Sequence, residues 1–106
     1  MTVIADAFKA LGDPVRLRLF HLLSLEEDLC VCHLTEATNL PQSTVSRHLA
    51  VLRHSGLVDT RREGKWIHYR LSGNMARILA PLVLEQADDT QLADAARLAV
   101  SATDCD

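Results

Sequence analysis

A chain of 106 residues is long enough for one small domain, and 48% hydrophobic residues are sufficient to form its core. Since aromatic residues make up only 4%, we expect a core of Leu, Val, Ala and Ile packed between helices. Met1–Leu11 contains Asp6 and no uninterrupted apolar run, and no segment approaches the ~18 apolar residues of a membrane span. We therefore expect neither a signal peptide nor membrane association.

The net charge of −3 conceals a division along the chain. Residues 40–70, here called the basic stretch, contain six Lys or Arg and two Asp or Glu, whereas the remainder contains five and twelve. Three of the five histidines also lie in the basic stretch. Because phosphate binding requires a local basic surface whatever the total charge, this division favours nucleic-acid binding by residues 40–70.

Apolar periodicity predicts four helices in the first half of the chain. An apolar stripe over residues 3–11 indicates the first, which Gly12 should end. Asp13 and Pro14 should begin the second, because Asp can cap unpaired amides and Pro at the first helical position sacrifices no hydrogen bond. A short third helix is expected within residues 29–38. The fourth, about residues 42–54, should bury Val45, Leu49 and Leu52.

The second half begins with two runs, residues 57–62 and 65–71, separated by Glu63 and Gly64. Alternating apolar and polar residues in the second run predict a β-hairpin with a basic tip. Residues 74–88 should return to helix, with a kink or a late start at Pro81, and residues 91–101 should form one more. The expected fold is a mainly α single domain over residues 1–106, ordered α-α-α-α-β-β-α-α with a small β-hairpin.

Two helices joined by a short turn and followed by a basic hairpin are typical of a winged helix-turn-helix. A recognition helix must pack one face on the domain and offer small hydrogen-bonding side chains plus Arg on the other, because such groups read major-groove base edges. The hairpin can meet phosphates or a minor groove as the wing. The candidate DNA-binding residues are Gln42, Ser43, Thr44, Ser46, Arg47, His48, Arg61, Arg62 and Lys65.

Cys30 and Cys32 lie about ten residues ahead of the predicted recognition helix. Three cysteines, two of them this close, suit thiolate ligation in a reducing cytosol better than structural disulfides, so we expect a cytoplasmic protein. Thiolates select soft ions such as As(III), Sb(III), Cd(II), Hg(II) or Pb(II). Within a regular helix, residues two apart point ~200° away from each other. Binding one ion should therefore distort the start of the third helix and misplace the recognition helix.

Several ordered segments strongly resemble the arsenic-responsive ArsR/SmtB repressors. They are Leu-Gly-Asp-Pro-Val-Arg-Leu-Arg at residues 11–18, Leu-Cys-Val-Cys-His-Leu at 29–34, Gln-Ser-Thr-Val-Ser-Arg-His-Leu at 42–49, Leu-Arg-His-Ser-Gly-Leu-Val at 52–58 and Arg-Glu-Gly-Lys-Trp-Ile-His-Tyr-Arg-Leu at 62–71. The resemblance covers roughly residues 3–85. It implies a helix-turn-helix at about 29–55, a wing at about 57–71 and dimerisation through about 2–12 and 74–101.

The resemblance also implies a function. A homodimer would bind the palindromic operator of a metalloid-resistance operon and leave it when As(III) or Sb(III) binds the thiolates of Cys30 and Cys32, with no organic cofactor. On that basis the candidate dimer residues are Val3, Ile4, Phe8, Ile78, Leu82 and Val83.

The third ligand of such a site is open. Arsenic-responsive members often carry a cysteine three residues after the second of the pair, where this chain has Thr35, and His33 stands where the motif usually has Asp. Cys105 could complete the site from the tail of either subunit, which we favour; a small thiol could do so, or the pair could be two-coordinate. His33 ranks lower as a ligand. The zinc site that the family carries on its late helix is rejected, since residues 74–101 contain no His.

Other functions compete with this interpretation. The cysteines could form a redox or persulfide switch, with a bridge to Cys105 preferred over a strained one between Cys30 and Cys32. The same cysteines could sense Cd, Pb or Hg, or a DNA-binding scaffold could have no inducer. An enzyme is not expected, because Cys32 and His33 would diverge on a helix and no third group orients the His.

Overall fold

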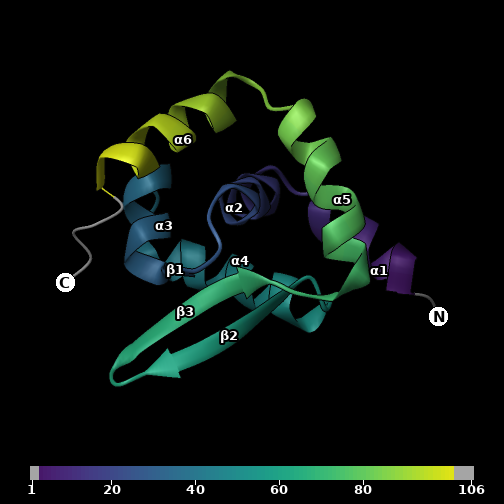
Figure 1. Cartoon of the computed structure of the whole chain (residues 1–106), viewed down its shortest axis with the longest axis horizontal. Coiled ribbons are helices and arrows are strands. Elements are labelled where there is room, and N and C mark those ends of the chain that lie inside the picture. The colour runs from purple at the N-terminus through teal and green to yellow at the C-terminus, as the bar shows by residue number, and fades with distance from the viewer. Residues whose placement is uncertain (1–2, 102–106) are drawn as a thin grey trace.

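The computed structural model describes residues 3–101 (Figure 1). Within that range the elements are α1 (Val3–Leu11), α2 (Pro14–Leu25), β1 (Leu29–Cys30), α3 (Val31–Thr38), α4 (Gln42–His54), β2 (Val58–Glu63), β3 (Trp66–Leu71), α5 (Gly73–Glu85) and α6 (Asp89–Ser101). The mainly helical fold and the β-hairpin are as predicted. Helix α5 begins at Gly73 and runs through Pro81, so the predicted late start at the proline is wrong. No helix among the described residues is both long and apolar enough to cross a membrane.

The sheet has one more strand than expected. Its order is β1-β3-β2, antiparallel throughout, so that the two-residue strand β1 extends the predicted hairpin. Leu29 pairs with Tyr69 and Cys30 pairs with His68. A short helix was predicted within this segment and a strand was not, because two residues are too few to show a period-two pattern. Residues 29–38 therefore divide into a strand that joins the wing and a helix that begins at Val31.

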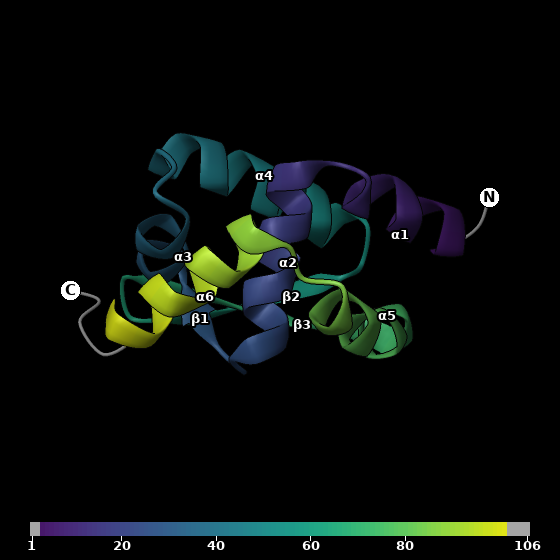
Figure 2. The same ribbon diagram turned by 90° about the horizontal axis from the view of Figure 1, so that it is seen from above.

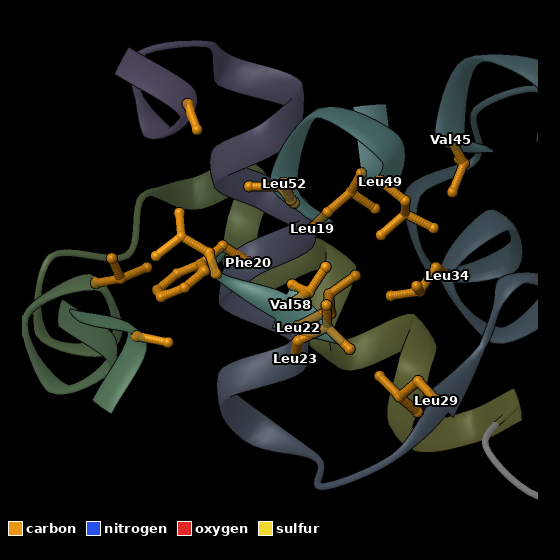
Figure 3. Close-up of a cluster of buried hydrophobic side chains, with 14 of the residues drawn as sticks. Leu19, Phe20, Leu22, Leu23, Leu29, Leu34, Val45, Leu49, Leu52 and Val58 are labelled. Carbon is orange, nitrogen blue, oxygen red and sulfur yellow. The ribbon is translucent and has the colours of Figure 1, made fainter. Parts of the chain in front are cut away.

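Helix α2 lies at the centre, with the other helices and the sheet arranged around it (Figure 1). Its start agrees with the prediction, since the Asp13 carboxylate accepts from the amides of Val15 and Arg16 at 2.9 and 3.1 Å and Pro14 is the first helical residue. The side chains of α2 meet the inner faces of α3 and α4 in the core (Figure 3). The fully buried members are Leu19, Phe20, Leu22, Leu34, Ala37, Val45, Leu49, Leu52 and, on α1, Ala7.

Helix α6 is fastened to the domain by a buried carboxylate. Asp94 is fully buried, and both its oxygens accept from Arg18 at 2.9 Å, while Oδ1 also accepts from Arg97 at 3.0 Å. The same two arginines donate to the last turn of α3, Arg18 to the Thr38 carbonyl and Arg97 to the Ala37 carbonyl. Carbonyls at a helix end need outside donors, and Arg18 of α2 and Arg97 of α6 supply them for α3, beside which α6 lies (Figure 2).

Candidate nucleic-acid interface and cysteine site

Helix α4 has the two-faced character that a recognition helix requires. Val45, Leu49 and Leu52 have no exposed surface and attach the helix to the core, as predicted. On the other side, Gln42, Ser43 and Arg47 are exposed, whereas Thr44 and Ser46 are half-buried. The helix lies along an outer edge of the molecule (Figure 2), where its polar side is accessible.

His48 faces the domain rather than the solvent. Its side chain is 14% exposed, and Nδ1 lies 3.4 Å from Arg16 Nη1 and 3.8 Å from Asp13 Oδ2. The N–H of Arg16, which donates to the Asp13 carboxylate, is the largest of the influences that hold the pKa of Asp13 below its usual value. His48 therefore connects α4 to the first turn of α2, and its role as a DNA contact stays a prediction.

The wing presents its basic residues unequally. Gly64 forms the turn with a positive φ of 63°, a conformation that favours glycine. Arg62 and Lys65 beside it are exposed, the ammonium of Lys65 lying 5.4 Å from the centre of the Trp66 ring. Arg61 instead donates to Asp28 at 2.5 Å and to Glu63 at 3.0 Å. These two carboxylates, Asp28 foremost, raise the pKa of Arg61 and form ion pairs with its positive charge.

Cys30 and Cys32 lie together at the start of α3. Cys30 is the N-cap, with extended angles of φ −84° and ψ 166°, and Cys32 is the second helical residue. Their sulfur atoms are 2.9 Å apart, and Cys30 is only 3% exposed. The prediction that ion binding distorts the start of α3 assumed that both cysteines lie within one regular helix, whereas Cys30 precedes the helix with extended backbone angles. Since Cys30 lies outside the helix, the divergence of helical neighbours does not apply to the pair.

The polar side chains near the cysteine pair differ in their hydrogen bonding. His33 Nδ1 accepts from the Cys30 amide at 3.4 Å and lies 3.5 Å from Cys30 Sγ, while the buried Nε2 has no hydrogen-bond partner among the described residues. The Thr35 hydroxyl donates to the Val31 carbonyl at 2.8 Å. Within residues 3–101, no three His, Cys, Asp or Glu side chains are arranged to hold a metal ion. Cys105 lies outside the described residues.

An apolar surface runs over α1 and α5, which lie next to each other (Figures 1 and 2). Of the six side chains predicted to form a dimer contact, five are at least half exposed: Val3, Ile4, Phe8, Ile78 and Leu82. The sixth, Val83, is 9% exposed and packs in the core of its own subunit. We call the five exposed side chains the apolar face.

Comparison with known proteins agrees with this geometry. The sequence pattern described as "Bacterial regulatory protein, arsR family" matches residues 13–60. The arsenical resistance operon repressor of Escherichia coli (strain K12) is 47% identical over 78 residues, covering 74% of this chain and 67% of that protein. A cadmium resistance transcriptional regulatory protein CadC homolog of Staphylococcus aureus is 40% identical over 68 residues, covering 64% and 56%.

Among solved structures, a homodimeric winged helix-turn-helix DNA-binding domain from Mycobacterium bovis, described as a possible ArsR-family transcriptional regulator, is 34% identical. It superposes with a TM-score of 0.69 over 76% of this chain and 74% of that chain. These proteins are regulators of transcription and not enzymes. With its winged helix-turn-helix and its ordered motifs, the chain belongs to the bacterial arsR family of regulatory proteins.

Proposed function

We propose that this protein is a homodimeric cytoplasmic repressor that binds operator DNA and releases it when As(III) or Sb(III) binds Cys30 and Cys32. The observation that carries the proposal is the 2.9 Å separation of the two sulfurs at the start of α3, the first helix of the helix-turn-helix. The similarity to a relative named for arsenical resistance supports the choice of metalloid. Soft thiolates and a soft ion are chemically matched.

DNA binding is assigned to the exposed polar side of α4 and to the tip of the wing. Gln42, Ser43 and Arg47 have the exposure and the donor groups to read base edges, with Thr44 and Ser46 beside them. Arg62 and Lys65 are suited to phosphate contacts, which position the protein without reading sequence. His48 would need to leave Asp13 and Arg16 to reach DNA.

A second copy of the chain is the proposed partner of the apolar face. Large apolar side chains that gather on one surface usually mark an interface, and the relative from Mycobacterium bovis is homodimeric. A two-fold dimer would present two copies of α4 to successive half-sites of a palindrome.

Cys105 is the proposed third ligand, contributed by its own or the partner subunit. Helix α6 passes beside α3, where Arg97 donates to the Ala37 carbonyl at 2.7 Å. The eight residues of α3 span ~12 Å, and the four residues that follow Ser101, up to Cys105, can extend ~13 Å. The extended length of these four residues is therefore comparable with the length of α3. The cysteine pair lies at the start of that helix.

The regulation follows from linkage. The two sulfurs already lie together while α3 is intact. For the ion to release the DNA, it must bind more tightly to the conformation of the protein that has the lower DNA affinity. A third sulfur drawn toward the pair would change the packing at the start of α3. The recognition helix is joined to α3 by a short turn and would move with it.

The test is a fluorescence anisotropy titration of the protein bound to its own promoter DNA. As(III), Sb(III), Cd(II) and Zn(II) are added separately to the wild type and to Cys30→Ser, Cys32→Ser and Cys105→Ser. We expect As(III) and Sb(III) to release the wild type, and the first two variants to bind DNA normally but not respond. Release that survives both changes would refute the cysteine site, and an unchanged As(III) affinity for Cys105→Ser would eliminate the tail as ligand.

A thiol redox switch is the second candidate, and the proximity of the two sulfurs favours it as well. Hydrogen peroxide would oxidise two thiols to one disulfide, taking two electrons and two protons and leaving two molecules of water. Adding peroxide in a separate arm of the same titration distinguishes the two functions. Release by peroxide alone would replace the metalloid proposal with this one.

A further inference from the structure

We propose that the cysteine pair controls the wing directly, through the β1–β3 pairing and an ion pair between Arg61 and Asp28. Arg61 is then a positioning residue for the wing rather than a phosphate contact. This inference rests on the proposed function, since it requires an inducer that binds at Cys30 and Cys32.

The first connection is the sheet itself. Cys30 is the Cα partner of His68 on β3, and His68 is in turn the partner of Arg61 on β2. Directly opposed residues in antiparallel strands project to the same face of a sheet, so these three form one row across it. Backbone at Cys30 is therefore part of the sheet that carries the wing, and a shift of Cys30 displaces β3.

The second connection is the ion pair. Asp28 lies two residues before Cys30, and its Oδ2 accepts from Arg61 Nη2. Its other oxygen, Oδ1, is buried and has no hydrogen-bond partner among the described residues. Because this buried oxygen has no partner, stabilisation of the negative charge on Asp28 depends on the contact of Oδ2 with Arg61. The segment that leads into Cys30 is thus held to strand β2.

The ion pair continues toward the tip of the wing. Arg61 Nη1 also donates to Glu63 at 3.0 Å, and Glu63 Oε1 lies 3.8 Å from His68 Nε2. Charged and polar side chains therefore connect Asp28, before the cysteine pair, to both strands of the wing. Since the charge of Arg61 is already matched by two carboxylates, a phosphate would have to displace one of them.

Arg62 is the matched control because it has the same side chain on the next residue of the same strand. It is exposed, and its guanidinium contacts the Gly64 carbonyl of the wing turn at 3.4 Å. Arg62 is thus placed to contact phosphate while remaining outside the proposed connection.

The experiment measures DNA affinity with and without inducer for Asp28→Asn, Arg61→Gln and Arg62→Gln. The inducer is whichever of As(III), Sb(III) or Cd(II) releases the wild type. We expect Asp28→Asn and Arg61→Gln to bind the inducer normally but to reduce its effect on the DNA dissociation constant by about two- to fivefold, the scale of one partly exposed ion pair. The double variant with Asp28→Asn and Arg61→Gln should lose no more of the inducer effect than either single variant, because both substitutions break the same contact.

Arg62→Gln should instead weaken DNA binding at all inducer concentrations and lower its salt dependence, with the inducer effect unchanged. A second readout needs no DNA. Trp66, the single tryptophan of the chain, lies on β3, so its fluorescence should respond to inducer in the wild type and respond less in Asp28→Asn.

The outcomes separate this inference from the proposed function. If no ion releases the wild type, the proposed function fails and this inference with it. If the wild type responds, Cys30→Ser does not, and both ion-pair variants respond fully in affinity and fluorescence, only the inference is wrong. If Arg61→Gln behaves as Arg62→Gln does, Arg61 is a phosphate contact and the inference is again overturned.

Discussion

Replacing Asp94 with Asn should detach α6 from the domain, because this carboxylate is the only fully buried charge among the described residues. Three charge-assisted hydrogen bonds converge on it, two from Arg18 and one from Arg97. The side chain of Arg18 is only 17% exposed, so the substitution leaves a largely buried cation without its counter-charge.

The expected loss in the free energy of unfolding follows from the burial of each partner in the ion pair. Breaking a buried ion pair by removing one partner costs about 3–5 kcal/mol. The lower end applies here, since Arg97 is 39% exposed and Asn can still accept one hydrogen bond from Arg18. We therefore expect Asp94→Asn to lower the free energy of unfolding by about 3 kcal/mol, a large share of the 5–15 kcal/mol typical of a domain.

Urea unfolding followed by circular dichroism measures this loss. The matched control is Asp89→Asn on the same helix, where the side chain is exposed and the change should stay within about 0.5 kcal/mol. A loss for Asp94→Asn below about 1 kcal/mol would show that the cluster does not hold α6, and the reasoning from buried charge would be refuted.

Three further changes test other parts of the structure. Asp13→Ala should cost about 1 kcal/mol by thermal unfolding at pH 6. Because the pKa of Asp13 is lowered on folding, that contribution is fully present above the unfolded pKa of about 3.9 and is lost as the pH falls through the lower folded pKa, so the difference between the variant and the wild type should narrow as the pH is lowered below 4. Phe8→Asp should give a folded monomer by analytical ultracentrifugation, whereas Leu25→Asp, 44% exposed and outside both predicted dimerisation segments, should remain dimeric; the reverse result would contradict the assignment of the interface to the apolar face. Arg47→Ala should weaken operator binding by about 1–3 kcal/mol in anisotropy and relax sequence preference. Arg53→Ala, in the last turn of the same helix, should keep that preference, and equal loss of preference would contradict the assignment.

Local patterns predicted most of the secondary structure because each element carries its own signal. Asp13 and Pro14 mark the start of α2 through hydrogen bonds made within the first turn. The spacing of Val45, Leu49 and Leu52 defines the buried side of α4, since helical periodicity depends only on the helix. Strand β1 had no such signal, because its partner β3 lies about forty residues away in the chain.

The candidate site was predicted in its members but not in its geometry. Cys30 and Cys32 were identified from their spacing, yet their 2.9 Å contact depends on the change from strand to helix at Val31. Arg61 and Arg62 were equivalent in sequence, and Asp28, with which Arg61 forms an ion pair, is 33 residues from Arg61. His48 and Val83 were likewise assigned to surfaces that the packing of α2 and the core makes less accessible.

By itself, the sequence determined the helices, the hairpin and the polar side of α4, and it identified the cysteine pair as a candidate site, because these follow from residue types and from periods shorter than one element. The tertiary structure decided which charges are neutralised, which apolar side chains remain exposed, and that Cys30 belongs to the sheet of the wing. Those properties depend on contacts between segments far apart in the chain, and the chain must fold before such contacts exist.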